Sequence, residues 1–144
     1  MNTVNIGDIG EAIAIAQFTK AGFIISKPLS NNARYDFIVE YNNKLYKIQV
    51  KTTSSIKEGV MVFATKTTNY TKGNWASKKY DKDSIDAFFL YCQENNWSGL
   101  YFGEDNGEFN QSLNIRLAPT KVNRTKGIKF AEDYSFEKQL NNFI

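Results

Sequence analysis

The sequence contains no histidine, and Cys92 is its only cysteine. These absences exclude an intramolecular disulfide, a Ser-His-Asp triad, a histidine-dependent nuclease and an ordinary zinc site. Any metal ligands must therefore be oxygen atoms, which favours Mg²⁺, with Mn²⁺ as a substitute.

Long hydrophobic runs are also absent. No stretch approaches the roughly 20 apolar residues of a membrane-spanning helix, and the N-terminus lacks the basic segment and apolar run of a signal peptide. We therefore expect a soluble, cytoplasmic protein with no membrane partner, folded as one domain over residues 1–144. The net charge of +3 permits a polyanionic partner without requiring one, so the local distribution of charge is more informative.

Residues 34–53 predict a β-hairpin, because apolar and polar residues alternate on both sides of Asn42-Asn43. Two asparagines tolerate positive φ and can form a two-residue turn. Such a turn places Asp36 directly opposite Gln49, with Cβ atoms about 5 Å apart, and Lys51 one step further along the same face. A three-residue turn would shift this register by one.

A carboxylate, an amide oxygen and an ammonium group at one end of a hairpin suit hydrolysis of a phosphodiester. Asp36, Gln49 and the backbone carbonyl of Val50 can bind a divalent cation that polarises a phosphate and a water molecule. Lys51 can hold or deprotonate that water. The alternative is that Asp36 ends a strand and that Gln49 and Lys51 lie on a solvated face, since such spacing often arises by chance.

Residues 6–20 lack proline and predict an α-helix that is apolar on nearly every side. Its two apolar patches are Ile6, Ile9, Ile13 and Ala16 on one side, and Ile15 and Phe18 on the other. Glu11 emerges beside side chains that favour burial. A buried, unpaired carboxylate is costly, so we expect a cation or a hydrogen-bond donor near it. The alternative is that Glu11 lies at the rim of the helix and reaches solvent.

Glu11 on a first helix, followed by a hairpin with Asp36 and Gln49-Val50-Lys51, resembles the PD-(D/E)XK nucleases, in the variant in which glutamine replaces the second acidic residue. More narrowly, GDIGEAIAIAQF and SKPLSNNARYDFIVEYNNKLYKIQVKTT are similar to group I intron homing endonucleases with a restriction-enzyme-like fold. The match is densest over residues 7–53.

The resemblance implies an α/β fold of the restriction-endonuclease type, a mixed central sheet flanked by helices, and metal-dependent, sequence-specific cleavage of double-stranded DNA. It implies that Asp36 is the main metal ligand, completed by Gln49 and the Val50 carbonyl. Lys51 would orient the attacking water or stabilise developing charge, and Glu11 would hold a second metal or a water molecule on the metal. A Holliday junction resolvase or a restriction-type nuclease would use the same site, and a non-catalytic DNA-binding module is an alternative of another class.

Three basic segments are candidate DNA-binding surfaces, because lysine and arginine neutralise phosphates. They are the loop over residues 27–34, residues 66–82 with their interleaved Tyr70, Trp75 and Tyr80, and residues 119–130, which contain no acid. The alternative for each is a solvated segment; residues 66–82 could be a loop with a short helix. The candidate DNA-binding residues are Lys27, Asn31, Arg34, Lys66, Lys72, Lys78, Lys79, Lys121, Arg124 and Lys126, among which Arg124 could contact guanine.

Further strands are expected at residues 23–25, 59–65, 85–92, 100–102 and 113–117. We expect residues 59–65 to join the hairpin's sheet, residues 85–92 to be buried on both faces, and residues 113–117 to form the last strand. Residues 133–144 predict a closing helix with Phe136, Leu140 and Phe143 on one side. A double-strand break needs two sites on opposite strands, so we expect a homo-oligomer, either a dimer or, by the resemblance, a tetramer. The apolar stripe of the closing helix is its candidate interface. The alternative, which the sequence does not decide, is that the stripe packs on this domain itself.

Overall fold

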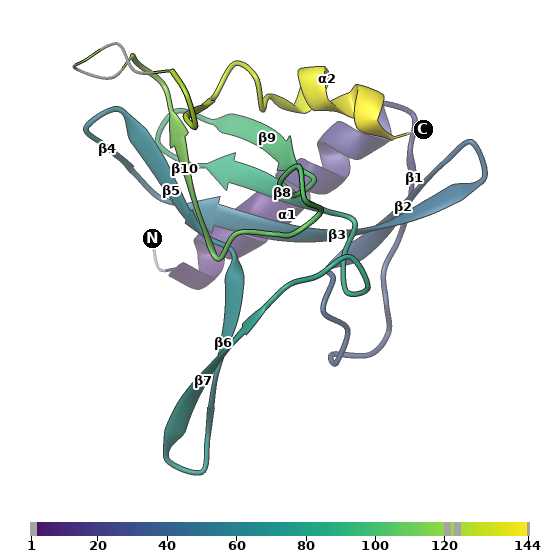
Figure 1. Cartoon of the computed structure of the whole chain (residues 1–144). Helices are drawn as coiled ribbons and strands as arrows, with labels where there is room; N and C mark the ends of the chain where they lie inside the picture. The colour runs from purple at the N-terminus through teal and green to yellow at the C-terminus, as the bar shows by residue number, and fades with distance from the viewer. Residues whose placement is uncertain (1–2, 120–121, 123–124, 144) are drawn as a thin grey trace.

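The structure is a computed structural model that describes residues 3–119, 122 and 125–143 (Figure 1). A five-stranded sheet in the order β1-β2-β3-β8-β9 forms its centre. Only β3 and β8 are parallel, so the sheet is mixed, as predicted. The strands are β1 (Ile24–Ser26), β2 (Phe37–Tyr41), β3 (Lys44–Thr53), β8 (Ala87–Cys92) and β9 (Trp97–Tyr101).

The β2–β3 hairpin has the predicted turn and register. Asn42 and Asn43 form a two-residue turn with φ angles of 53° and 64°, which asparagine tolerates better than most residues. The pairing runs from this turn without a slip to Phe37, which lies opposite Ile48. Both of these side chains are fully buried, so the apolar face of the hairpin is fixed toward the core.

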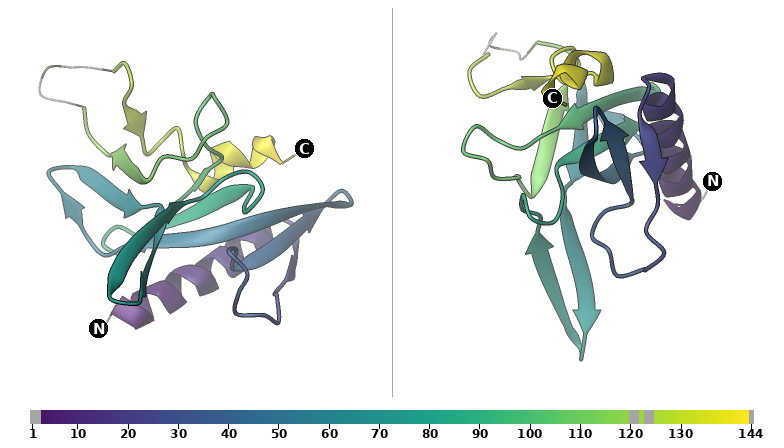
Figure 2. Two further views of the ribbon diagram at one scale, coloured as in Figure 1. Left: turned by 60° about the horizontal axis from the view of Figure 1, so that its bottom comes forward. Right: turned by 90° about the vertical axis from the view of Figure 1, so that its right-hand side faces the viewer.

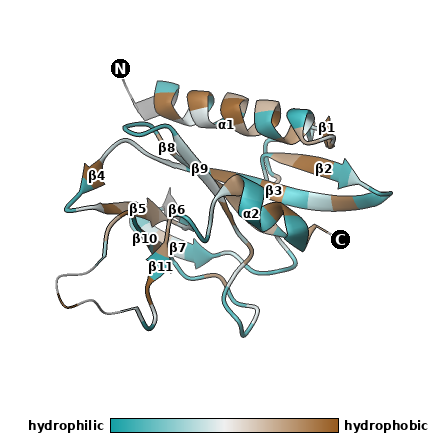
Figure 3. Ribbon diagram, turned by 90° about the horizontal axis from the view of Figure 1, so that it is seen from above, coloured by the Kyte–Doolittle hydropathy of each residue, from teal (hydrophilic) through white to brown (hydrophobic). Residues whose placement is uncertain are grey.

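The strand β8 is buried at all six of its residues, which confirms the prediction for this segment. The reason is that both faces of the sheet are covered. On one face lies the helix α1 (Thr3–Lys20), and on the other lies a second sheet (Figure 3). Phe89 packs in the core on the α1 face, whereas Phe88 and Leu90 pack in the core between the sheets.

The second sheet has the strand order β11-β10-β5-β4. Its strands are β4 (Ile56–Lys57), β5 (Val60–Ala64), β10 (Ser112–Arg116) and β11 (Lys129–Phe130). The expectation that residues 59–65 join the hairpin's sheet is therefore wrong. Met61 and Phe63 are buried while Val62 is exposed, so β5 buries a single face, directed against β8. Residues 113–117 are not the last strand either, because β11 follows and pairs with β10 in parallel.

Residues 66–79 form a separate two-stranded hairpin, which we call the arm. It consists of β6 (Lys66–Thr71) and β7 (Asn74–Lys79). Its turn residues Lys72 and Gly73 have positive φ angles of 53° and 79°. The arm extends away from the body of the protein (Figures 1 and 2). The alternative of a loop with a short helix is thus wrong for this segment.

The C-terminal segment forms a short helix, α2 (Phe136–Gln139), followed by a 3₁₀ turn, η1 (Leu140–Asn142). Phe136 and Phe143 are each only 4% exposed. Their rings meet the ring of Phe18 on α1 at centroid distances of 5.1 and 5.8 Å. The expectation that this apolar stripe is a subunit interface is therefore wrong, because the chain buries it in its own core. Within the described part of the chain, no helix is long and apolar enough to cross a membrane.

The helix α1 packs on β3 through a line of small and aromatic residues. Among residues 5–20 of the helix, the buried positions are Gly10, Ala14 and Phe18, spaced four residues apart, whereas Ala16 of the expected stripe is exposed. A β-carbon at Gly10 would lie 2.3 Å from Cγ2 of Thr52 on β3. Glycine at this position therefore allows the helix to approach the strand that carries Gln49, Val50 and Lys51.

We predict that Gly10→Ala destabilises the protein by about 1 to 3 kcal/mol, because the new methyl group overpacks the contact with Thr52. Gly7→Ala on the same helix is the matched control, since no atom lies within 4 Å of the place that its new methyl group would occupy. This control should stabilise the helix by about 0.5 to 1 kcal/mol. Urea unfolding measures both changes.

Thr52→Ser removes the methyl group that Gly10→Ala would meet, so the double variant should recover most of the lost stability. Equal unfolding midpoints for Gly10→Ala and Gly7→Ala would contradict this account of the helix–strand contact.

Candidate active site

Asp36 lies immediately before β2, at the point where the pairing of β2 with β3 ends. Its backbone N–H donates to the carbonyl of Ile48 at 2.8 Å. Its carboxylate oxygen Oδ2 accepts a hydrogen bond from the Val50 N–H, also at 2.8 Å. Asp36 therefore turns toward Val50 and does not extend the ladder opposite Gln49, which corrects the predicted pairing of these two residues.

The backbone carbonyl of Val50 lies on the same edge of β3 as Asp36. Along a strand, successive residues direct their backbone groups to alternate sides. The carbonyls of Lys47 and Thr53 accept hydrogen bonds from Asp86 and Gln93, which lie at the two ends of β8. The backbone N–H and carbonyl groups of odd-numbered residues of β3 thus point toward β8. Those of Val50 point to the other side, toward Asp36, because the Val50 N–H donates to the Asp36 carboxylate. A carboxylate and a carbonyl oxygen are therefore neighbours at this edge.

The electrostatic environment of Asp36 favours a nearby cation. Burial raises the pKa of the Asp36 carboxyl above its ordinary value, and the negative charge of Glu11 adds to that rise. The hydrogen bond from Val50 and the positive charges of Lys51 and Lys27 act in the opposite direction. Glu11, Lys27 and Lys51 are thus close enough to Asp36 to influence its ionisation, so the structure brings these predicted residues together.

Glu11 forms an ion pair with Lys27, which lies on the loop after β1. The Glu11 side chain is 28% exposed, and that of Lys27 is 58% exposed. The hydrogen bond that Lys27 donates to Glu11, together with the negative charge of Glu11, raises the pKa of Lys27. The expectation that Glu11 has a cation beside it is confirmed, and that cation is Lys27. Contact of Lys27 with DNA stays a prediction.

Gln49 and Lys51 are both partly exposed and follow each other on one face of β3. The Lys51 ammonium lies 5.4 Å from the ring centre of Tyr80. Tyr80 is only 4% exposed, so the expectation that it stands on a DNA-facing surface is wrong. Trp75 on the arm is 73% exposed. The side chain of Tyr70 lies outside the described part of the structure.

The donor set of this site consists entirely of oxygen atoms. No cluster of three Asp, Glu, His or Cys side chains that could hold a metal occurs among residues 3–119, 122 and 125–143. The available ligands are instead the carboxylates of Asp36 and Glu11, the amide oxygen of Gln49 and the carbonyl of Val50. Such ligands suit a hard cation such as Mg²⁺, which keeps several waters and needs only one or two carboxylates.

The predicted DNA-binding residues occupy different parts of the molecule. Arg34 directs its guanidinium at the base of the arm, where its nearest acceptor is Thr67 Oγ1 at 3.2 Å. Lys79 pairs with Glu108 at 3.4 Å. Lys66 at the base of the arm is half-buried, whereas six of the candidates are exposed, namely Lys27, Asn31, Lys72, Lys78, Lys79 and Lys126. Lys121 and Arg124 lie outside the described residues.

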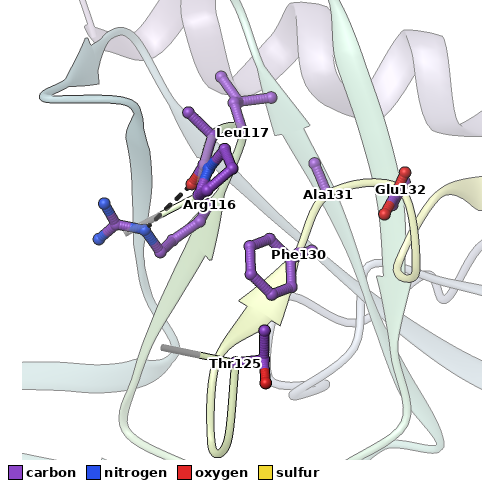
Figure 4. A pocket seen from close by; sticks show the side chains of 8 residues that line it. Arg116, Leu117, Thr125, Phe130, Ala131 and Glu132 are labelled. Atoms are coloured by element: carbon purple, nitrogen blue, oxygen red, sulfur yellow. Dashed lines mark hydrogen bonds between the residues drawn. The ribbon is translucent and has the colours of Figure 1, made fainter. Parts of the chain in front are cut away.

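A pocket of about 570 Å³ opens between the ends of β10 and β11 (Figure 4). Its wall is largely apolar and includes Leu117, Pro119 and Phe130, with Arg116 and Glu132 beside them. None of the candidate catalytic residues lines it. The pocket is therefore separate from the site around Asp36.

The sequence alone did not reveal the roles of Lys27, Arg34 and Tyr80 in this arrangement. Lys27 reaches Glu11 across 16 positions, and Arg34 and Tyr80 meet across a separation of 46 positions in the chain, with the Arg34 Cζ 4.1 Å from the ring centre. The only local signal was the placement of Lys27 and Arg34 in the loop that leads to Asp36.

Comparison with known proteins identifies the family and a solved structure of similar fold. The family model for PD-(D/E)XK endonucleases matches residues 1–137. Among solved structures, the bacterial homing endonuclease I-Ssp6803I has a similar fold, with a TM-score of 0.74 and 24% sequence identity, covering 94% of this chain and 89% of that chain. No curated protein matched the chain.

The resemblance drawn from Glu11, Asp36 and Gln49-Val50-Lys51 is therefore confirmed at the level of the family, and the restriction-endonuclease-like fold is confirmed with it. Since the family model covers nearly the whole chain, the protein belongs to the PD-(D/E)XK endonuclease family.

Proposed function

We propose that this nuclease cleaves double-stranded DNA at a specific sequence, as a divalent-metal-dependent endonuclease of the homing type. The observation that carries the proposal is the contact between the Asp36 carboxylate and Val50, beside Lys51 and Glu11. The family match supports a nuclease. The similarity to a protein described as a homing endonuclease supports the finer assignment.

Asp36, Gln49 and the carbonyl of Val50 would bind Mg²⁺, or Mn²⁺ in its place. When bound, such an ion polarises the scissile phosphate and lowers the pKa of a coordinated water. The carboxylate of Asp36 is fixed for this role by the Val50 N–H. The orientation of the Asp36 carboxylate therefore depends on the backbone of β3. A metal ligand held rigidly in this way favours a defined coordination geometry.

The Lys51 ammonium lies close enough to Asp36 for its positive charge to lower the pKa of that carboxyl. From there it orients the attacking water and stabilises the negative charge that develops on the phosphate oxygens. Glu11 would hold a second cation or a water molecule on the metal. Lys27, which pairs with Glu11, would contact a phosphate of the DNA.

The DNA-facing side is formed by the loop of residues 27–36 and the arm, which extend from the same side of the body (Figure 1). The arm presents the exposed Lys72 and Lys78. Together with Lys27, Asn31, Arg34, Lys66 and Lys79, these residues would neutralise phosphates and position the duplex. Lys121, Arg124 and Lys126 would add further contacts with phosphates, and the first two lie outside the described residues.

The proposed mechanism predicts that Asp36→Ala and Lys51→Ala each abolish cleavage of duplex DNA in Mg²⁺. Binding of the same DNA should stay within about tenfold, because contacts elsewhere provide most of the affinity. Lys57→Ala, an exposed lysine on β4, is the matched control and should cut at the parent's rate. Gel analysis of cleaved strands and a binding titration measure the two effects. Full activity in either active-site variant would rule out this mechanism.

A second prediction follows from the raised pKa of Asp36. In the folded protein, burial disfavours the ionised carboxylate, so above the folded pKa this group lowers stability. Asp36→Asn keeps an oxygen acceptor for the Val50 N–H but carries no charge. Without metal at neutral pH, Asp36→Asn should have a Tm about 3 °C above that of the parent protein.

This gain should shrink as pH falls below the folded pKa of Asp36, and it should vanish below the ordinary pKa of an aspartate in the unfolded chain, where the parent's carboxyl is neutral in both states. Mg²⁺ should reduce the gain at neutral pH by stabilising the parent only. Thermal melts over a pH series provide the test. A gain that stays constant down to the lowest pH would contradict the electrostatic explanation.

One active site cuts one strand, so a double-strand break requires two copies of the chain. We expect a homodimer or a homotetramer, acting on a pseudo-palindromic target with two half-sites. Sedimentation of the protein with its cleavable DNA measures the assembly. A chain that cuts both strands while it sediments as a monomer would contradict this expectation.

A further inference from the structure

Two cations approach the ring of Tyr80, which directly follows the arm. The guanidinium carbon of Arg34 lies 4.1 Å from the ring centre, and the Lys51 ammonium lies 5.4 Å from it. The ring is only 4% exposed. Attraction between a cation and an aromatic ring is strongest where water is excluded. A buried ring therefore joins the proposed catalytic lysine to an arginine two positions before Asp36.

Arg34 also connects both strands of the arm at its base. One guanidinium nitrogen donates to Thr67 Oγ1 on β6 at 3.2 Å and to the Lys78 carbonyl on β7 at 3.4 Å. The other donates to the Lys79 carbonyl and to Ser84 Oγ, both at 3.3 Å. Because a planar guanidinium has a fixed fork of donors, lysine could not reproduce this set.

The ring of Tyr80 is fixed from beneath by the central sheet. It meets the ring of Phe88 edge-on, at 5.1 Å between centroids and 81° between planes. Phe88 lies beside Gln49 in the parallel pairing of β3 with β8, and Leu90 lies beside Lys51. A displacement of Tyr80 would therefore disturb the positions of Gln49 and Lys51 on β3, since packed interiors do not deform freely.

We propose that Arg34 and Tyr80 are positioning residues that link the base of the arm to Lys51, so that DNA bound along the arm fixes the reactive position of the Lys51 ammonium. This inference rests on the proposed function of the site. The sequence predicted only a contact of Arg34 with DNA phosphate, and the positioning of Lys51 is an additional role. The physical reason is that small displacements of a group that orients a nucleophile cause large losses of rate.

The first test compares Tyr80→Leu with Tyr80→Phe in single-turnover cleavage of duplex DNA. Tyr80→Leu removes the ring and should lower the cleavage rate about 10- to 100-fold, with an unchanged dissociation constant for DNA. Tyr80→Phe keeps the ring and should cut at nearly the parent's rate. Cleavage by Tyr80→Leu at the parent's rate, or an equal loss in both variants, would overturn the proposal.

Phe109→Leu is the matched control for damage to the core. Its ring lies in the same core and meets Phe88 at 5.3 Å, but it makes no ring contact with Lys51 in the described structure. It should lower Tm about as much as Tyr80→Leu while it leaves the cleavage rate unchanged. An equal loss of rate in Phe109→Leu would show that core stability, and not the link to Lys51, limits cleavage.

The second test needs no cleavage and therefore separates this link from the nuclease function. In metal-free buffer, a mixed-sequence duplex is added while the ¹⁵N signal of the Lys51 amino group is followed, with Lys51→Met identifying the signal. The signal should shift in the parent and should not shift in Arg34→Lys, which keeps the charge but loses the fork. A shift of equal size in Arg34→Lys would overturn the link. The expected shift in a parent that never cuts would support the link and contradict only the proposed function.

Discussion

The hydrogen bond from the Val50 N–H to the Asp36 carboxylate is the interaction on which the site depends. β3 is ten residues long, whereas β2 begins only at Phe37, so the edge of β3 beyond Ile48 lacks a strand partner on that side in the described structure. Unpaired backbone groups require other partners. Asp36 satisfies the first of them with its side chain, and this places a carboxylate beside the Val50 carbonyl.

The charges around this contact determine what the site can bind. Two carboxylates, Asp36 and Glu11, lie near two lysines, Lys27 and Lys51, so the group is close to neutral overall. A divalent cation would make it positive, which matches an anionic phosphodiester. The close packing of α1 at Gly10 and the ring of Tyr80 keep these charges in place from opposite faces of β3.

Elements defined by neighbouring residues were predictable from the sequence. Alternation around Asn42-Asn43 specified the hairpin register, and the apolar run before Cys92 specified a strand buried on both faces. The separate sheet of β5 and the burial of Phe143 were not predictable, because each depends on contacts between distant residues. The arm pairs nearby residues, but its polar strands lack the apolar alternation that would have indicated a hairpin.

The same reason applies within the site. Asp36, Gln49 and Lys51 were found because they share one hairpin, whereas the contacts of Arg34 with Tyr80 and the arm join segments more than 30 positions apart. Local periodicity carries no information about such contacts.

The central claim is that the Asp36 site cuts duplex DNA at a specific sequence. Digestion of a randomised duplex library with Mg²⁺, run beside a four-way junction substrate and followed by sequencing of the cut ends, tests it most directly. The account predicts that one sequence family with two related half-sites is enriched among the cut ends, and that the junction is not preferred. Cleavage confined to the junction, or cut ends without any sequence preference, would contradict it.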